Sequence, residues 1–338
     1  MAYCTIVPPY LLDSLTRSDD AELAGCARRT LELDDVHRQA RAAAGVRQAA
    51  ATDGAEKRSV YDAQHGTTLP GQLVRSEGQA PTGDDDVNRS YDHLGDTWTF
   101  YSEVYDRDSV DGNGLALRAS VHYDQNYDNA FWNGDQMVFG DGDGTLFKSF
   151  TVPLDVTAHE LTHGVTQYSA NLEYKGQSGA LNESVSDVFG SLVKQYVGQQ
   201  TADQADWLIG TDLFAAGVQG KALRSMAAPG TAYDDPRLGK DPQPATMDGY
   251  VDTTDDNGGV HTNSGIPNHA FYLAATAIGG NAWEKAGLVW YRTLTSGSLP
   301  ASADFATFAN ATVSAAGAVG QDVADAVRKA WTGVKVLT

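Results

Sequence analysis

The spacing of apolar positions divides most of the chain into a strand-like part and a helical part. From about residue 57 to 150, short runs of β-type composition alternate with Gly/Asp turns: VYDAQ, GQLVRS, WTFYSEVY, ALRASVHY and QMVFG. From Asp155 onward, apolar residues recur at helical spacing, as far as DFATFANATVSAAGAVGQDVADAVRKAWTGV. The pattern predicts an α+β protein with a β-rich N-terminal domain and an α-helical C-terminal domain.

The first 50 residues form a third part. They begin with an extended stretch around Pro8 and Pro9 and continue with a helical pattern from about Asp19 to Gln48. An alanine-rich stretch ending at Gly54 then resembles a linker. We therefore expect a segment 1–50 and two domains, 51–168 and 169–338. A functional site is expected in the cleft between the two domains, where ligand sites often lie.

The richest local signal is the pentapeptide His159-Glu160-Leu161-Thr162-His163. Two histidines four residues apart lie on one face of a helix and can both reach one zinc ion. The glutamate between them can take the proton of a zinc-bound water. The alternative is an amphipathic helix with two surface histidines. The flanking residues argue against it because they are apolar: Val156, Ala158, Leu161 and Val165.

Zinc needs a third protein ligand, and Glu183 is the best candidate. It lies within the apolar pattern of a buried helix, where an unpaired carboxylate would be costly; the pattern is Leu181, Val185, Val188, Phe189 and Leu192. Asp187 follows one turn later and can orient a metal-bound histidine through its other ring N–H. The alternative is a pair of carboxylates at the start of a helix.

A second histidine lies in the stretch DNGGVHTNSG (256–265). Gly258 and Gly259 indicate a tight turn. Asp256 precedes His261 by five residues, close enough to orient it across that turn. An acid–histidine pair beside a zinc site can stabilise a developing oxyanion. A solvated loop histidine is the alternative.

With these stretches in hand, the chain resembles the thermolysin family of zinc endopeptidases. The matching motifs are HELTH, GALNESVSD, DNGGVHTNSGI, NAFWNG (129–134) and QMVFGDGDG (136–144), in the same order over roughly residues 59 to 338. The resemblance implies a thermolysin-like fold whose two domains are joined by the zinc-binding helix. It implies one zinc ion held by His159, His163 and Glu183, with Glu160 as general base.

The resemblance also implies further roles. Tyr174 and His261 would stabilise the oxyanion, with Asp256 supporting His261. The substrate backbone would be held by Asn129, Ala130 and Arg224. The apolar pocket for the residue after the scissile bond would be formed by Phe147, Phe150, Val156, Ile209, Leu213 and Leu223. We therefore expect cleavage of protein or peptide substrates on the N-terminal side of hydrophobic residues.

The first 50 residues resemble the short pro-segment of the protealysin-like subgroup. The matching residues are Cys4, Pro8, Pro9, Tyr10, Leu11 and Leu12. The implied role is an intramolecular inhibitor of a zymogen, removed by cleavage near residues 48–54. A permanent N-terminal arm is the alternative. Cys4 is either a zinc-binding thiolate or an inert thiol.

The chain departs from its larger relatives where they hold calcium. Asp155 and Asp206 stand at two of these positions, but Lys194 replaces an expected glutamate. The other replacements are Leu208, Thr211 and Lys221. An ammonium group removes the oxygen ligands that calcium requires. We expect Lys194 to pair with Asp155 or Asp206, and calcium to be reduced or absent.

Composition narrows the remaining classes. The net charge of −20, from 24 basic and 44 acidic residues, argues against a nucleic-acid partner. No run of about 18 apolar residues predicts a membrane span, and no Sec-type signal is visible. The family implies secretion, by a non-Sec route or with an intracellular pool. We expect a monomer, and the alternative to an enzyme is a zinc-binding, non-catalytic interaction scaffold.

Overall fold

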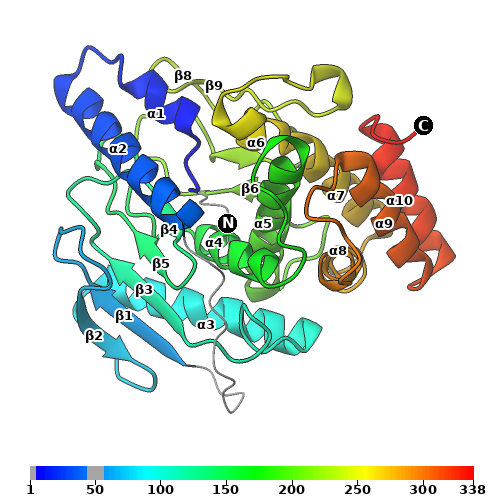
Figure 1. The fold of residues 1–338 in the computed structure, drawn as a ribbon, viewed down its shortest axis with the longest axis horizontal. Helices are drawn as coiled ribbons and strands as arrows, with labels where there is room; N and C mark the ends of the chain where they lie inside the picture. The colour runs from blue at the N-terminus through cyan, green and yellow to red at the C-terminus, as the bar shows by residue number, and fades with distance from the viewer. Residues whose placement is uncertain (1–4, 44–56) are drawn as a thin grey trace.

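A five-stranded mixed sheet forms the β-rich part of the molecule (Figure 1). The computed structural model describes the backbone of residues 5–43 and 57–338, and the side chains of these residues except 38–43. The sheet order is β2-β1-β3-β5-β4; β1 pairs parallel with β3 and β3 with β5, whereas β2 and β4 are antiparallel edge strands. The strands are β1 (Arg58–Asp62), β2 (Gln72–Ser76), β3 (Leu117–Val121), β4 (Ala130–Trp132) and β5 (Met137–Phe139).

Four of the five predicted strand runs are confirmed, and one, WTFYSEVY, is wrong. WTFYSEVY forms the end of helix α3 (Asp85–Tyr105), which packs against β1 and β3. The aromatic and β-branched residues of this run resemble a strand. The helix is decided earlier in the chain, where Asp84 accepts hydrogen bonds from the backbone N–H groups of Asp86 and Val87. Its buried side recurs at helical spacing, at Val87, Tyr91, Leu94, Tyr101 and Tyr105.

Helices dominate from Leu154 onward, as predicted, but residues 198–255 contain only short strands and one 3-10 turn. Helix α4 (Leu154–Gln167) packs against α3 and β4 on one side and against α5 (Gly176–Val197) on the other, so it joins the two parts. The remaining helices are α6 (Asp256–Asn263), α7 (Gly265–Ile278), α8 (Ala286–Thr295), α9 (Phe305–Gly317) and α10 (Gln321–Gly333), with a 3-10 turn η1 (Met247–Gly249). Two short hairpins lie between α5 and α6: β6 (Leu208–Ile209) with β7 (Arg224–Ser225), and β8 (Asp234–Asp235) with β9 (Gly239–Lys240).

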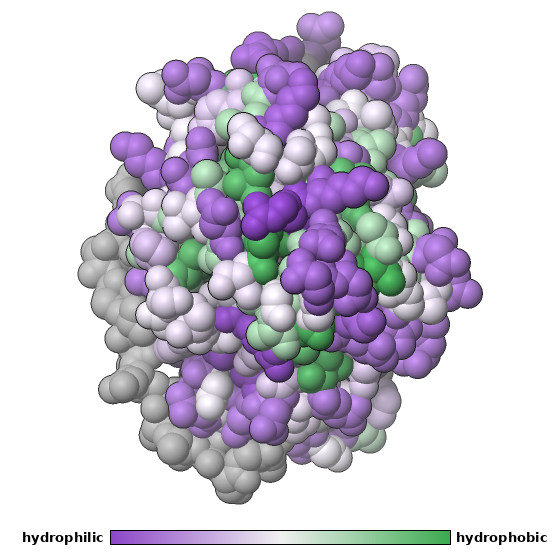
Figure 2. All heavy atoms as spheres, turned by 90° about the vertical axis from the view of Figure 1, so that its right-hand side faces the viewer, coloured by the Kyte–Doolittle hydropathy of each residue, from purple (hydrophilic) through white to green (hydrophobic). Residues whose placement is uncertain are grey.

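The C-terminal helices pack around stacked tryptophans. The rings of Trp290 and Trp331 lie 6.0 Å apart at 9°, and Phe308 meets both edge-on. Figure 2 shows this end of the molecule from outside, where hydrophilic residues separate small hydrophobic patches. Among the described residues, no helix has the length and apolar character needed to cross a lipid bilayer.

The predicted pro-segment forms two helices, α1 (Pro9–Leu15) and α2 (Ala21–Ala43), which pack against each other. They lie beside β4, β5 and β8 in Figure 1. Arg29 forms an ion pair of 3.0 Å with Asp124, and the Ser14 hydroxyl donates to the carbonyl of Arg237. Cys4 and the predicted cleavage site near 48–54 lie outside the described residues.

Candidate metal centre and active site

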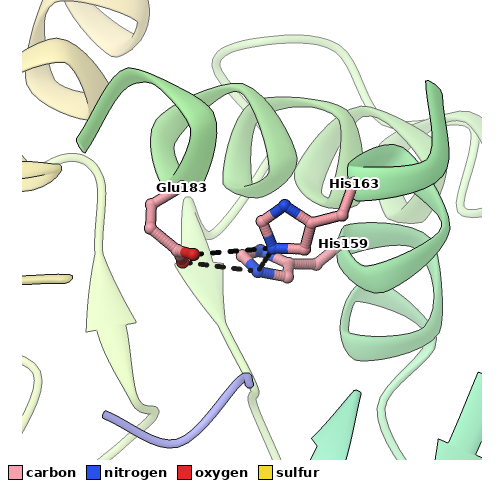
Figure 3. A group of neighbouring side chains, drawn as sticks. All are labelled: His159, His163 and Glu183. Atoms are coloured by element: carbon pink, nitrogen blue, oxygen red, sulfur yellow. Dashed lines mark hydrogen bonds and ion pairs between the residues drawn. The ribbon is translucent and has the colours of Figure 1, made fainter. Parts of the chain in front are cut away.

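The three predicted zinc ligands meet between α4 and α5. His159 and His163 point from successive turns of α4, and Glu183 faces them from α5 (Figure 3). The Nε2 atoms of the histidines are 3.1 Å apart, and each lies 3.5 Å from a Glu183 oxygen. All three side chains are buried.

Hydrogen bonds on the far side of each imidazole determine its tautomer. His159 Nδ1 lies 2.8 Å from a carboxylate oxygen of Asp187, which can only accept, so Nδ1 carries the proton. His163 Nδ1 lies 2.8 Å from the amide oxygen of Asn182 and 3.0 Å from the Ser186 hydroxyl. Burial lowers the pKa of His163 to about 3. Both Nε2 atoms are therefore lone-pair donors that face each other.

This donor set fits a zinc ion. Two imidazole lone pairs and a carboxylate lie within 4.8 Å of one another, the N,N,O combination of catalytic zinc sites. Glu183 Oε1 accepts from the Tyr174 hydroxyl, while its buried Oε2 has no hydrogen-bond partner. Three electron-pair donors aimed at one point need a cation between them.

Glu160 lies next to this group, on the same helix. Its Oε2 accepts a hydrogen bond of 3.0 Å from the backbone N–H of Trp132 in β4, and its Oε1 is buried without a partner. Burial, reinforced by the charge of Glu183, raises the pKa of Glu160 well above its usual value. The strand thus fixes one oxygen and leaves the other without a hydrogen-bond partner.

His261 is fixed by a left-handed backbone turn. Four successive residues, Asp256 to Gly259, have φ between 49° and 91°, and this turn folds Asp256 back onto His261. The Asp256 carboxylate accepts from the backbone N–H (2.8 Å) and Nδ1 (2.7 Å) of His261. Burial lowers the pKa of His261, but Asp256 and Glu183 outweigh it and raise the pKa to about 9. The Tyr174 hydroxyl lies 3.3 Å from His261 Nε2.

Arg224, on β7, is anchored by the same carboxylate that orients His159. Its Nε and Nη2 each donate to Asp187 at 2.8 Å, a bidentate pair buried on both sides. Asn268 on α7 donates a further hydrogen bond to Asp187, also at 2.8 Å, so that Asp187 accepts four in all. Asp187 therefore connects His159 to the guanidinium group of Arg224.

The stretch Thr5–Val7 of the pro-segment lies against this site. The N–H of Ile6 donates to the carbonyl of Ala130 (3.2 Å), and the N–H of Val7 donates to Asn129 Oδ1 (2.9 Å). Both acceptors belong to the sheet side of the site.

The helical side holds the carbonyls of the same stretch. Arg224 Nη1 donates to the carbonyl of Ile6 (3.0 Å). His261 faces Asp256 with its Nδ1 and lies with its Nε2 3.0 Å from the carbonyl of Thr5. Four residues predicted from the sequence thus converge on three consecutive residues of the chain itself.

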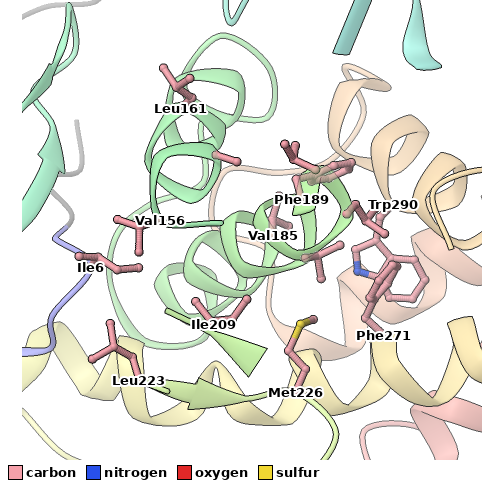
Figure 4. Packing of buried hydrophobic residues seen from close by; sticks show 14 of the residues in the cluster. Ile6, Val156, Leu161, Val185, Phe189, Ile209, Leu223, Met226, Phe271 and Trp290 are labelled. Carbon is pink, nitrogen blue, oxygen red and sulfur yellow. The ribbon is translucent and has the colours of Figure 1, made fainter. Parts of the chain in front are cut away.

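The side chain of Ile6 enters the predicted apolar pocket. Figure 4 shows Ile6 with Val156, Ile209 and Leu223 at one side of the buried cluster. Phe147 and Phe150 lie in the same cluster, with their rings 5.8 Å apart. Together with Leu213, all six predicted pocket residues are buried.

The sequence did not point to Asn182, Asn268 or the N–H of Trp132. Asn182 fixes His163, Asn268 holds Asp187, and Trp132 holds Glu160. Both asparagines are buried, Asn182 next to Glu183 within the apolar pattern of α5 and Asn268 on the mostly apolar α7. A polar residue within such a pattern is the signal that could have found them; a backbone donor leaves no signal in sequence.

Comparison with known proteins agrees with this geometry. The family model described as "Thermolysin metallopeptidase, catalytic domain" matches residues 32–167, and "Thermolysin metallopeptidase, alpha-helical domain" matches 170–336. The chain is 52% identical to an "Extracellular metalloprotease" of Pectobacterium carotovorum subsp. carotovorum over 98% of this chain and 96% of the relative. It is 41% identical to a thermolysin of Alicyclobacillus acidocaldarius subsp. acidocaldarius over 82% of this chain and 50% of that protein.

A solved structure is similar over the whole chain. The precursor of protealysin, a metalloproteinase from Serratia proteamaculans, has a TM-score of 0.92 and 53% identity, covering 99% of this chain and 100% of that chain. The chain therefore belongs to the thermolysin family of metallopeptidases, as a neutral zinc endopeptidase made as a precursor.

Proposed function

We propose that zinc is held by His159, His163 and Glu183, and that Asp187 and Asn182 keep both histidines in the ligating tautomer. When bound, zinc supplies a Lewis acid that polarises the scissile carbonyl and acidifies water. Glu160, with one oxygen anchored on Trp132 and the other open, takes a proton from the attacking water and delivers it to the leaving amine.

His261 and Tyr174 are the oxyanion donors in this proposal. His261 is held by Asp256, and its Nε2 lies against the carbonyl of Thr5. A donor that already faces a peptide carbonyl is placed to follow the charge that develops there. Asp256 acts through His261 and is a positioning residue.

The backbone contacts of Thr5–Val7 are the observation from which we infer how a substrate lies in the site. Ala130 and Asn129 hold two N–H groups and Arg224 holds the carbonyl between them, as a bound peptide would require. Ile6 occupies the apolar pocket here. In this register the bond to be cut is the peptide bond that precedes the residue in the pocket. We infer cleavage on the N-terminal side of hydrophobic residues.

The test is digestion of casein and of a quenched peptide after removal of the pro-segment. We expect Glu160→Ala to lower kcat/KM by about 10²–10⁴-fold because the proton transfer is lost. A zinc chelator should abolish activity, and zinc should restore it. Glu284→Ala, which removes an exposed carboxylate in the turn before α8, is the matched control. Full activity of Glu160→Ala would overturn the mechanism, whereas a processed wild type without activity would favour the non-catalytic scaffold.

We further propose that residues 1–50 inhibit the site until they are removed, and that 51–168 and 169–338 are the two domains of the protease. Occupation of the site by Thr5–Val7 supports the first part. The boundary between the two family matches, at 167 and 170, supports the second. We also propose that the enzyme is secreted, since a relative is named extracellular, and that it acts as a monomer.

The last part of the proposal concerns Lys194, whose ammonium group lies among oxygen atoms where a calcium ion was considered. Lys194 Nζ lies 3.2 Å from Asp155, 2.9 Å from Asp206, 3.3 Å from the carbonyl of Leu208 and 3.2 Å from the Thr211 hydroxyl. An ammonium group thus binds four oxygen-bearing groups that could otherwise surround a hard cation. We propose that Lys194 takes the structural place of calcium.

A further inference from the structure

The pro-segment is bent where it crosses the active site, and one side chain closes the bend. The chain turns at Ile6 and Val7 instead of continuing extended. The Thr5 hydroxyl donates to the carbonyl of Val7 at 3.2 Å, and Thr5 is only 3% exposed. Both atoms of this hydrogen bond belong to the segment itself.

The bond between Thr5 and Ile6 lies in the register that the proposed mechanism cuts. His261 faces the Thr5 carbonyl, while Ala130 and Arg224 hold the backbone of Ile6. The Thr5–Val7 hydrogen bond therefore ties the residue before the peptide bond to a residue beyond it. Pro8 and Pro9 follow at once and stiffen the same stretch, since proline fixes φ.

We propose that Thr5 is a positioning residue that makes the pro-segment an inhibitor instead of a substrate, an inference that rests on the proposed function. Hydrolysis of the Thr5–Ile6 bond consumes one water, breaks the C–N bond and leaves a carboxylate on residue 5 and an amine on Ile6. For the products to leave, these ends must separate. The hydroxyl bond holds them together, so that a cut is reversed more often than it is completed.

The matched variants are Thr5→Val, which keeps the shape and removes the hydroxyl, and Thr5→Ser, which keeps the hydroxyl. In the zinc-loaded full chain, followed by intact mass, we expect Thr5→Val to be cut between residues 5 and 6 about five-fold faster than wild type. Thr5→Ser should behave as wild type. The double variant Thr5→Val/Glu160→Ala should stay whole if the cut comes from the chain's own site.

A second measurement needs neither metal nor activity. In the metal-free chain, amide hydrogen exchange at Ile6 and Val7 should be about five-fold faster in Thr5→Val, because loss of the hydroxyl bond opens the bend more often. Thr5→Ser should again match wild type.

Equal exchange in Thr5→Val and wild type, or equal cutting in the two zinc-loaded chains while the processed enzyme digests casein, would overturn the role of Thr5 and leave the protease assignment intact. Cutting of wild type between residues 5 and 6 as fast as Thr5→Val would do the same. A processed enzyme that digests no casein would instead overturn the proposed function, with the exchange result still deciding the bend.

Discussion

Arg224 and Asp187 form an ion pair that is buried on both sides, and its loss should be costly. Arg224→Ala leaves a carboxylate in the interior with its charge partner removed, which typically destabilises by about 3–5 kcal/mol. We expect a loss of that size in denaturant unfolding, together with a higher KM because Arg224 holds the peptide carbonyl. The control is Arg118→Ala: its pair with Asp135 is exposed and spans 3.5 Å, so a loss below about 1 kcal/mol is expected. Similar losses in the two variants would contradict the argument.

His122 gives the fold a dependence on pH that is separate from the active site. Its hydrogen bond to Asp141 (2.8 Å), together with that to Asp84 (2.9 Å), raises the pKa of His122 from 6.5 to about 9 against the effect of burial. His65 also approaches Asp141, at 3.4 Å. Because the folded pKa is raised, the stabilisation is complete below pH 6.5 and is lost as the pH rises through about 9.

We therefore expect His122→Gln to cost more stability at pH 6 than at pH 10. The difference should be on the order of 1–2 kcal/mol, since partly exposed partners weaken the interaction. Denaturant unfolding of both proteins at the two pH values measures it. An equal loss at both would show that His122 contributes through packing and not through its charge.

The approach of α4 to α5 depends on a glycine. A Cβ at Gly190 would lie 2.7 Å from the carbonyl of Asp155 and 3.4 Å from His159, so the two helices would have to move apart. Gly190→Ala should destabilise by about 1–3 kcal/mol and weaken zinc retention, because the proposed ligands come from both helices. Gly317→Ala, at the end of α9 with open space around its Cβ, should be neutral or stabilising. Zinc titration and thermal unfolding of both variants decide the point.

Lys194 connects α5 to α4 and to the segment leading into β6. A calcium-selective chelator that leaves zinc in place should not change Tm, because the ammonium group already binds the available oxygens. Lys194→Ala should lower Tm by roughly 5 °C or more, since Asp155 would remain buried without its charge partner. A large fall in the Tm of wild type on removing calcium would refute the proposed replacement.

The sequence predicted features that depend on residues close together in the chain, and it missed those that depend on distant ones. His159 and His163 lie four residues apart on one helix, so their spacing predicted their common face, with Glu160 next to the first of them. WTFYSEVY was assigned wrongly because its composition is strand-like, while the N-cap and inward face that make it helical lie up to fourteen residues earlier. The strand β4 is only three residues long and left no alternation to detect.

The spacing of apolar and polar residues could not predict contacts between distant parts of the chain. The bond from Arg224 to Ile6 spans 218 residues, and that from His261 to Thr5 spans 256. Such contacts arise from packing of whole elements and leave no local periodicity. The resemblance to a family implied which residues of the protease bind a peptide, but only the structure shows that residues 5–7 contact those residues.

The hold of the pro-segment on the whole molecule extends well beyond these three residues. Apolar side chains all along it are buried, partly between α1 and α2 and partly against the protease: Ile6, Val7, Leu11, Leu12, Leu15, Leu23 and Ala27. Each larger one is worth about 1.5–3 kcal/mol when fully buried, a sum comparable with the roughly 4–15 kcal/mol that association costs. Ion pairing of Arg29 with Asp124 adds to it.

Cutting the chain between α2 and β1 should therefore not release the segment at once. With a cleavage site for an unrelated protease inserted between residues 44 and 56, we expect both fragments to co-elute on gel filtration and casein activity to stay low. Activity should appear only as the segment is degraded or diluted away. Leu12→Asp, which places a charge at a fully buried position, should release it immediately after the cut. Immediate full activity of the cut wild type would mean that covalent attachment, and not the buried surface, maintains latency.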